Sequence, residues 1–169
     1  MSAISKDDVL NLREKTGAGL IDCKRALIES AGDLDEAVSI LRKKGIASAA
    51  KKAGRDAGEG IIAQSISADK SKGVLVEVNC ETDFVAKNED FVAFANAIAQ
   101  RLLDEPEADL ESARTEQVAK IGENIRISRS QALEPKDNGL IESYVHTGAK
   151  VAVLLSLGTG SAAASSDSK

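Results

Sequence analysis

The first third of the chain shows the apolar spacing of short amphipathic helices. Over residues 5 to about 53, apolar side chains recur three and four positions apart, as one buried helix face requires. Ser5 precedes the first segment and a carboxylate, Asp8, follows three positions later, which is the pattern of a helix N-cap. Glycines interrupt the pattern after each segment. The spacing therefore predicts a compact bundle of three short helices, over about 5–16, 20–30 and 33–45.

A basic segment follows the third predicted helix. It contains six basic residues and no acidic one in an alanine-rich context: Arg42, Lys43, Lys44, Lys51, Lys52 and Arg55. We expect a fourth helix or a helical linker here. Its charge has two interpretations, a solvated cationic helix face or a spacer that also faces an acidic or phosphate-bearing partner.

The apolar period changes from 3.6 to 2 beyond Gly58 and Gly60, which marks a second domain. Residues 61–67 and 74–80 read as a hairpin, because apolar and polar positions alternate on both sides of a polar turn. Asn88 then caps a helix whose apolar stripe is Phe91, Phe94, Ala95, Ile98 and Leu102.

The rest of this domain is predicted as a helix over 110–121, a strand over 125–133 and a last hairpin of 140–146 with 149–157. The fold class is therefore α+β, with an antiparallel sheet packed against helices. We assign 1–54 to the helical module and its basic linker, and 55–157 to the α+β core. Residues 158–169, rich in serine and alanine, are expected to be a disordered tail.

Composition narrows the class of partner. Hydrophobic residues make up 43% and charged residues 29% of the 169 positions, but aromatic residues make up only 2% and the formal charge is −5. Stacking surfaces for single-stranded nucleic acid need several aromatic faces, and phosphate binding needs an excess of clustered lysine and arginine. We expect a protein or small-molecule partner and no direct contact with nucleic acid. No apolar stretch approaches the length of a membrane span and no signal peptide is evident, so a soluble cytoplasmic protein is expected.

Catalytic chemistry finds little support in the sequence. There is one histidine, His146, and the two cysteines, Cys23 and Cys80, form no CxxC pair. Neither a phosphate-binding loop nor a dinucleotide fingerprint is present. We therefore expect a protein that is not an enzyme and that has no cofactor and no tightly held metal. An enzyme that uses Cys80 or His146 remains as a weaker alternative.

The segment Thr82, Asp83, Phe84 and Val85, named here the wedge segment, lies between a predicted strand and a predicted helix cap. Phe84 has two interpretations. Its ring either folds back onto the following helix as a hydrophobic staple, or stands out from the scaffold and enters a pocket of a partner.

Four motifs carry a resemblance to a known family. They are TGAGLIDCKRAL at 16–27, VEVNCETDFVAK at 76–87, AKIGENI at 119–125 and YVHTGAK at 144–150. In this order and spacing they resemble the elongation factor Ts family, the guanine-nucleotide exchange factors of elongation factor Tu, over residues 3 to about 157. The family's common longer form continues with further segments, so the resemblance implies a C-terminally shortened form.

The resemblance implies a function and a set of contacts. The N-terminal module would be a ubiquitin-associated-like bundle that docks on the nucleotide-binding domain of elongation factor Tu, and the core would be capable of forming a homodimer. The wedge segment would displace Mg²⁺ from the GTPase, so that GDP leaves and GTP can bind. Other partner contacts would be Leu12, Leu20, Ile21, Ile121 and His146.

Two of these contacts have an alternative role. Leu12 is also a candidate for the bundle core, and Ile121 for burial at a helix end. The alternative function is a protein-interaction adaptor that uses the ubiquitin-associated-like module without promoting nucleotide exchange.

Overall fold

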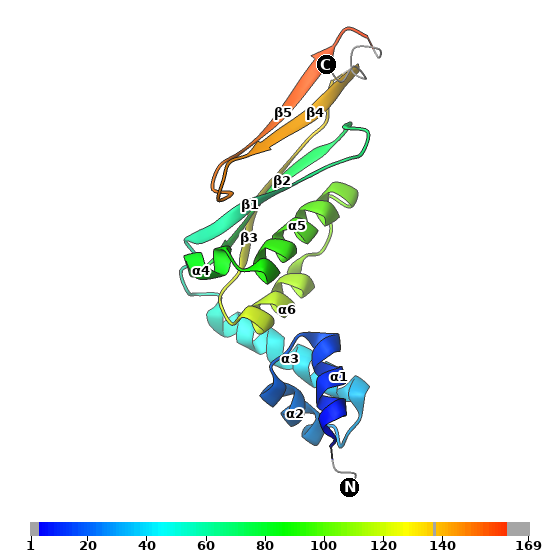
Figure 1. The fold of residues 1–169 in the computed structure, drawn as a ribbon, viewed down its shortest axis with the longest axis vertical. Coiled ribbons are helices and arrows are strands. Elements are labelled where there is room, and N and C mark those ends of the chain that lie inside the picture. Colours follow the sequence, from blue (N-terminus) through cyan, green and yellow to red (C-terminus); the bar gives the residue numbers. More distant parts are fainter. Residues whose placement is uncertain (1–3, 137, 162–169) are drawn as a thin grey trace. The chain divides into compact units, whose positions relative to one another are not determined.

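The computed structural model describes residues 4–136 and 138–161, which form two compact units (Figure 1). The first unit comprises the N-terminal part of the chain up to Arg55 together with 111–124, and the second comprises 56–110 and the chain from Ile125 onward. The first contains α1 (Lys6–Thr16), α2 (Leu20–Glu29), α3 (Leu34–Lys52) and α6 (Glu111–Ile121). The second contains β1 (Glu59–Ile66), β2 (Gly73–Cys80), α4 (Asp83–Ala86), α5 (Glu89–Asp104), β3 (Arg126–Leu133), β4 (Asn138–Val145) and β5 (Ala152–Thr159).

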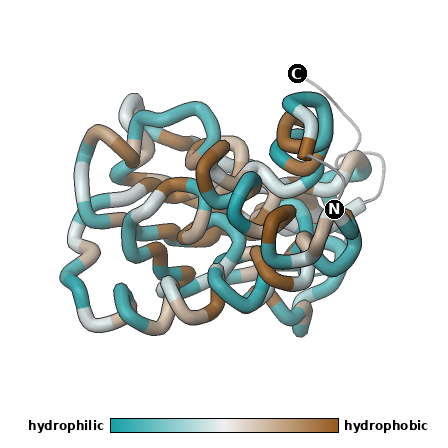
Figure 2. Tube along the Cα trace, turned by 90° about the horizontal axis from the view of Figure 1, so that it is seen from below, coloured by the Kyte–Doolittle hydropathy of each residue, from teal (hydrophilic) through white to brown (hydrophobic). Residues whose placement is uncertain are grey.

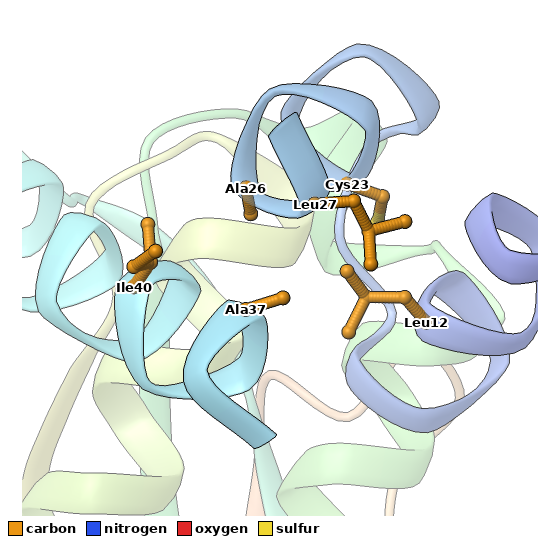
Figure 3. Packing of buried hydrophobic residues seen from close by; sticks show 6 residues of the cluster. All are labelled: Leu12, Cys23, Ala26, Leu27, Ala37 and Ile40. Atoms are coloured by element: carbon orange, nitrogen blue, oxygen red, sulfur yellow. The ribbon is translucent and has the colours of Figure 1, made fainter. Parts of the chain in front are cut away.

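The three N-terminal helices pack around a small aliphatic core. The Asp8 amide donates to Ser5 Oγ at 3.1 Å, and the Ser5 amide donates to the Asp8 carboxylate at 3.0 Å, so a full capping box starts α1. Figure 3 shows the side chains that meet between the helices, which are Leu12, Cys23, Ala26, Leu27, Ala37 and Ile40. The predicted bundle of three helices is confirmed.

The prediction that the third helix ends at Gly45 is wrong, because α3 continues to Lys52 and includes most of the basic segment. Gly45 is buried where α6 crosses α3: a Cβ added to Gly45 would lie 3.4 Å from the Ala119 Cβ. The glycine therefore permits a close approach of two helices instead of terminating one.

The position of α6 also differs from the expected organisation. The sequence pattern predicted this helix as part of the 55–157 core, whereas α6 packs on α3 and belongs to the first unit. Small residues on α3, Gly45 and Ala49, leave room for Thr115 and Val118 of α6, both of which are buried. A pattern within α6 alone does not reveal this, because the complementary small residues lie some 65 to 75 positions earlier in the chain.

The second unit is built on the antiparallel sheet β1-β2-β3 with α5 packed against it. Val74, Val76 and Val78 alternate along β2 and are almost fully buried, and Phe91 and Ile98 of α5 are buried as well. Hydrophobic and hydrophilic stretches alternate along the trace, as the colours of Figure 2 show. The α+β fold class is confirmed.

The β4–β5 hairpin forms a second antiparallel sheet that packs on the first. Ile141 is fully buried, and its backbone amide donates to the Lys70 carbonyl in the β1–β2 turn at 2.8 Å. β5 extends to Thr159, so the prediction that residues 158 and 159 belong to a disordered tail is wrong: the ladder continues, with Gly158 opposite Gly139. Residues 162–169 of the predicted tail lie outside the described residues.

The helices of the described ranges do not have the character of membrane spans. Neither α3 nor any other helix among them combines the length and the apolar content that a bilayer span needs.

Candidate functional site

The wedge segment forms a capped helical turn rather than an open loop. Thr82 is the N-cap of α4, and its side-chain oxygen accepts a hydrogen bond from the Val85 amide at 3.3 Å. The Cys80 thiol at the end of β2 donates to the Thr82 carbonyl oxygen at 3.2 Å. The first of these bonds caps α4, and the second joins its N-cap residue to the end of β2.

Phe84 points away from the protein interior. Its side chain is 81% exposed, whereas Ala86 on the same short helix is 4% exposed and Val85 is half-buried. The α4 turn thus packs on the sheet through Ala86 and presents the Phe84 ring to solvent. The interpretation of Phe84 as a staple onto α5 is wrong for this structure, since a staple would bury the ring. An aromatic ring on a fixed turn is well suited to fill a pocket in a partner.

Asp83 is an ionised carboxylate beside this ring. Its Oδ2 accepts a hydrogen bond from Lys87 Nζ at 2.7 Å, across one helical turn. The hydrogen bond and positive charge of Lys87 hold the pKa of Asp83 below its ordinary value. Asp83 raises the pKa of Lys87 in return, with a further contribution from the charge of Glu59. The wedge segment therefore presents an apolar ring next to an ion pair.

His146 follows β4 and is exposed. Its Nδ1 lies 3.0 Å from the Tyr144 hydroxyl oxygen, and the two rings are tilted by 52° with centroids 6.1 Å apart. Tyr144 is itself 61% exposed. Tyr144 is part of the motif at 144–150, but its pairing with His146 was not predicted from the sequence. The signal was present, because residues two apart on a strand share a face.

The remaining predicted contacts lie in the first unit. Leu20 and Ile21 begin α2 and are 44% and 69% exposed, so both are accessible to a partner. Leu12 is fully buried between the helices, so its prediction as a partner contact is wrong and it is a core residue. Ile121 ends α6 and is half-buried.

The arrangement gives no support to chemistry at the cysteines. Both thiols are buried, and burial raises the pKa of Cys23, which keeps that thiol protonated. The Cys80 thiol donates a hydrogen bond to the backbone carbonyl of Thr82, the first residue of the wedge segment. Within the part of the chain that the structure describes, no three histidine, cysteine, aspartate or glutamate side chains gather as a metal site.

Comparison with known proteins relates these features to a family. A family model described as Elongation factor TS matches residues 81–167, about half of the chain, and this range contains the wedge segment and His146. The chain is 47% identical over 166 residues to Elongation factor Ts of Clostridium botulinum (strain Alaska E43 / Type E3), and this alignment covers 90% of the chain and 54% of the relative. Its identity to Elongation factor Ts of Aquifex aeolicus is 45% over 174 residues, covering 90% and 59% of the two proteins.

A third relative agrees with these two. Elongation factor Ts of Alkalilimnicola ehrlichii is 47% identical over 171 residues, and this alignment covers 94% of the chain and 58% of the relative. The chain therefore spans somewhat more than half the length of the relatives that it matches. By the family model and by its identity to these relatives, the chain belongs to the elongation factor Ts family.

Proposed function

We propose that this chain acts in translation elongation as a guanine-nucleotide exchange factor that binds elongation factor Tu loaded with GDP. The observation that carries the proposal is the exposure of Phe84, held on a capped turn next to the Asp83 carboxylate. The ring and the carboxylate would move the parts of the GTPase that hold the nucleotide-associated Mg²⁺. Because Mg²⁺ neutralises phosphate charge, its displacement would leave the GDP phosphates weakly held.

The other exposed residues would supply additional binding. Leu20 and Ile21 offer an apolar contact from the helical module, and His146 with Tyr144 offers an aromatic contact from the β4–β5 hairpin. Ile121 would add a smaller apolar contact, since part of its side chain is already buried. We also expect a cytoplasmic location, where a translation factor would meet this partner.

Energetics require more than one contact. Exchange works by linkage: a factor that weakens nucleotide binding is itself weakened by nucleotide to the same extent, so GTP can release it. A 10⁴-fold shift in relative affinity requires about 5.5 kcal/mol of differential binding. Burying one phenylalanine supplies roughly 1.5–3 kcal/mol. The wedge segment and the contacts outside it would therefore have to act together.

We further propose that the chain can form a homodimer through β5. Val153, Leu155 and Leu157 alternate along this strand, so they share a face, and all three are about half exposed. Such a row of exposed aliphatic side chains on a two-stranded sheet is a candidate for pairing with the same surface of a second copy.

The decisive experiment measures release of fluorescent GDP from elongation factor Tu with and without the chain. We expect the wild-type chain to accelerate release and Phe84→Ala to lose about 2 kcal/mol or more of the effect, roughly 30-fold. Ile46→Ala is the matched control, because Ile46 is also an exposed apolar residue but lies on α3 outside the proposed contacts. Both variants should melt within a few degrees of the wild type, since neither removes a buried side chain.

Other outcomes would support the alternatives. Stable binding of the GTPase without faster release would favour an adaptor. If Phe84→Ala and Ile46→Ala accelerated release as well as the wild type, the assignment of the wedge segment would be wrong.

A further inference from the structure

Glu59, the first residue of β1, is fixed by its backbone beside the wedge segment. It lies opposite Cys80 in the β1–β2 register, and its carbonyl oxygen accepts a hydrogen bond from Asn79 Nδ2 at 3.2 Å. The neighbouring Gly60 allows the two strands to come this close, because a Cβ on it would lie 2.2 Å from the Val78 carbonyl oxygen. Since the Cys80 thiol in turn bonds to Thr82, Glu59 is two residue contacts away from the cap of α4.

The side chain of Glu59 reaches in the other direction, to the turn that carries His146. Its Oε2 lies 2.5 Å from Lys150 Nζ. Beside this ion pair, the Ile62 amide donates to the Ala149 carbonyl oxygen at 2.7 Å, and the Ala149 amide donates to the His146 carbonyl oxygen at 2.8 Å. Ala149 has a φ of +54°, a conformation that non-glycine residues adopt only when their surroundings hold them there.

We propose that Glu59 is a positioning residue, which holds the His146 turn at a fixed place relative to the wedge segment through its ion pair with Lys150. The inference rests on the proposed function, in which both features contact the same GTPase. A partner surface can accept two contact points together only if their separation matches its own pockets. If the two contact points are already held at that separation, less conformational entropy is lost on binding.

The ion pair between Glu59 and Lys150, named here the tie, is weak, so we expect it to affect the position of the His146 turn more than the stability of the fold. Both side chains are about half exposed, and an ion pair of this kind contributes little to overall stability. The charge of Glu59 is also felt by Lys87, the partner of Asp83, which raises the pKa of that lysine. Glu59 thus interacts with cations from both contact regions, Lys150 from the turn and Lys87 from the wedge segment.

The first test measures hydrogen exchange of the Ile62 amide in the full chain, without any partner. This amide bonds to Ala149, so its protection reports how firmly the turn lies on β1. We expect Glu59→Gln and Lys150→Met each to lower that protection about 1.5- to 5-fold, the range for an exposed ion pair. Lys150→Arg should preserve it, because the charge is kept. Unchanged protection in both neutral variants would overturn the proposal.

The matched control for this test is Glu142→Gln. Glu142 forms an exposed ion pair with Lys70, which also links the β4–β5 hairpin to the first sheet, but at the β1–β2 turn. Like Glu59→Gln, the control variant neutralises the carboxylate of an ion pair that joins the β4–β5 hairpin to the first sheet. We expect it to leave Ile62 protection unchanged, and a decrease equal to that of Glu59→Gln would show a general loosening that contradicts a specific tie.

The second test asks whether the tie couples the two contacts during nucleotide release. Phe84→Ala and His146→Ala are combined in the wild-type background and again with Glu59→Gln. If the contacts act together, the double variant should be impaired at least twofold less than the product of the single effects, and Glu59→Gln should abolish this non-additivity. A merely structural role for Glu59 would leave the coupling intact, and that result would overturn the proposal.

Failure of the proposed function would give a different result. In that case the wild-type chain would not accelerate GDP release at all, whereas the exchange of Ile62 would still report on the tie itself.

Discussion

Asp83 is a half-exposed carboxylate with a charged partner one helical turn away. Its carboxylate accepts a hydrogen bond from Lys87 Nζ. Because the Asp83–Lys87 ion pair is exposed to solvent, it contributes little to the stability of the fold and acts mainly on the local electrostatic potential. On contact with a partner, the Asp83 carboxylate would have to exchange or share this lysine.

The Asp83–Lys87 pair makes a testable pH prediction. The folded pKa of Asp83 is lowered, so the stabilisation from the pair is present above the ordinary aspartate pKa and is lost as the pH falls through the lowered value. We expect the Asp83 side-chain ¹³C resonance to titrate at lower pH than an unpaired aspartate, and Lys87→Met to move its midpoint upward. Lys43→Met, on the exposed side of α3, is the control and should leave that midpoint unchanged. An identical midpoint in the wild type and Lys87→Met would show that the pair does not persist in solution.

At the level of single residues, the sequence pattern identified candidate contact residues, but it did not determine how exposed each side chain is. The position of Phe84 between a strand and a cap left both a staple and an exposed ring open, and the exposed fraction of 81% decided between them. Leu12 has the same apolar character as Leu20, yet it is fully buried while Leu20 is 44% exposed. Which apolar residue of a helix is left uncovered depends on where the neighbouring helices lie, and a single helix does not encode this.

The contact of α3 with α6 shows that packing against a distant element can determine where a helix ends. A glycine at position 45 has the local character of a helix end, but the buried position of Gly45 against Ala119 keeps it inside α3. The packing gained on the α6 side offsets the intrinsic cost of glycine in a helix, which is about 0.5–1 kcal/mol relative to alanine.

Two substitutions at this position separate helix propensity from packing. Gly45→Ala places its methyl group at the edge of van der Waals contact with Ala119, so we expect a change within about 1 kcal/mol of the wild type, with the gain in helix propensity favouring stabilisation. Gly45→Leu should overpack the contact and lower the free energy of unfolding by about 1–3 kcal/mol. Urea denaturation followed by circular dichroism measures both. Equal stability of the two variants would show that α6 does not pack closely on α3.

At the level of the whole molecule, the exposed face of β5 leads to a prediction of self-association. Leu154, on the opposite face of β5, lies next to Gly73 of the first sheet, whereas the row of Val153, Leu155 and Leu157 is about half exposed and is available for a second copy. We expect sedimentation equilibrium to show a dimer for the wild-type chain and a monomer for Leu155→Lys, because a buried unpaired charge at a self-complementary interface is unfavourable.

The control for self-association is Ile28→Lys. Ile28 is an exposed apolar residue on α2, outside the β5 face, so this variant carries the same change in charge and should remain dimeric. A wild-type chain that stays monomeric at high concentration would contradict the proposed homodimer.

The sequence by itself determined which segments form helices and which form strands, and where most of them begin. Capping residues such as Ser5 and Asn88 mark helix starts through bonds to the next few amides, and the alternating valines of β2 mark a strand with one buried face. These signals are local, since each depends on interactions within one element. The motifs around Phe84 and His146 were equally visible, because they are contiguous in the chain.

Only the tertiary structure decided which of these elements join and which side chains remain uncovered. It placed α6 with α3, buried Leu12, exposed Phe84 and joined Glu59 to Lys150 across 91 positions of the chain. Such contacts depend on the three-dimensional approach of distant segments, whose packing competes with local preference and can override it, as Gly45 shows.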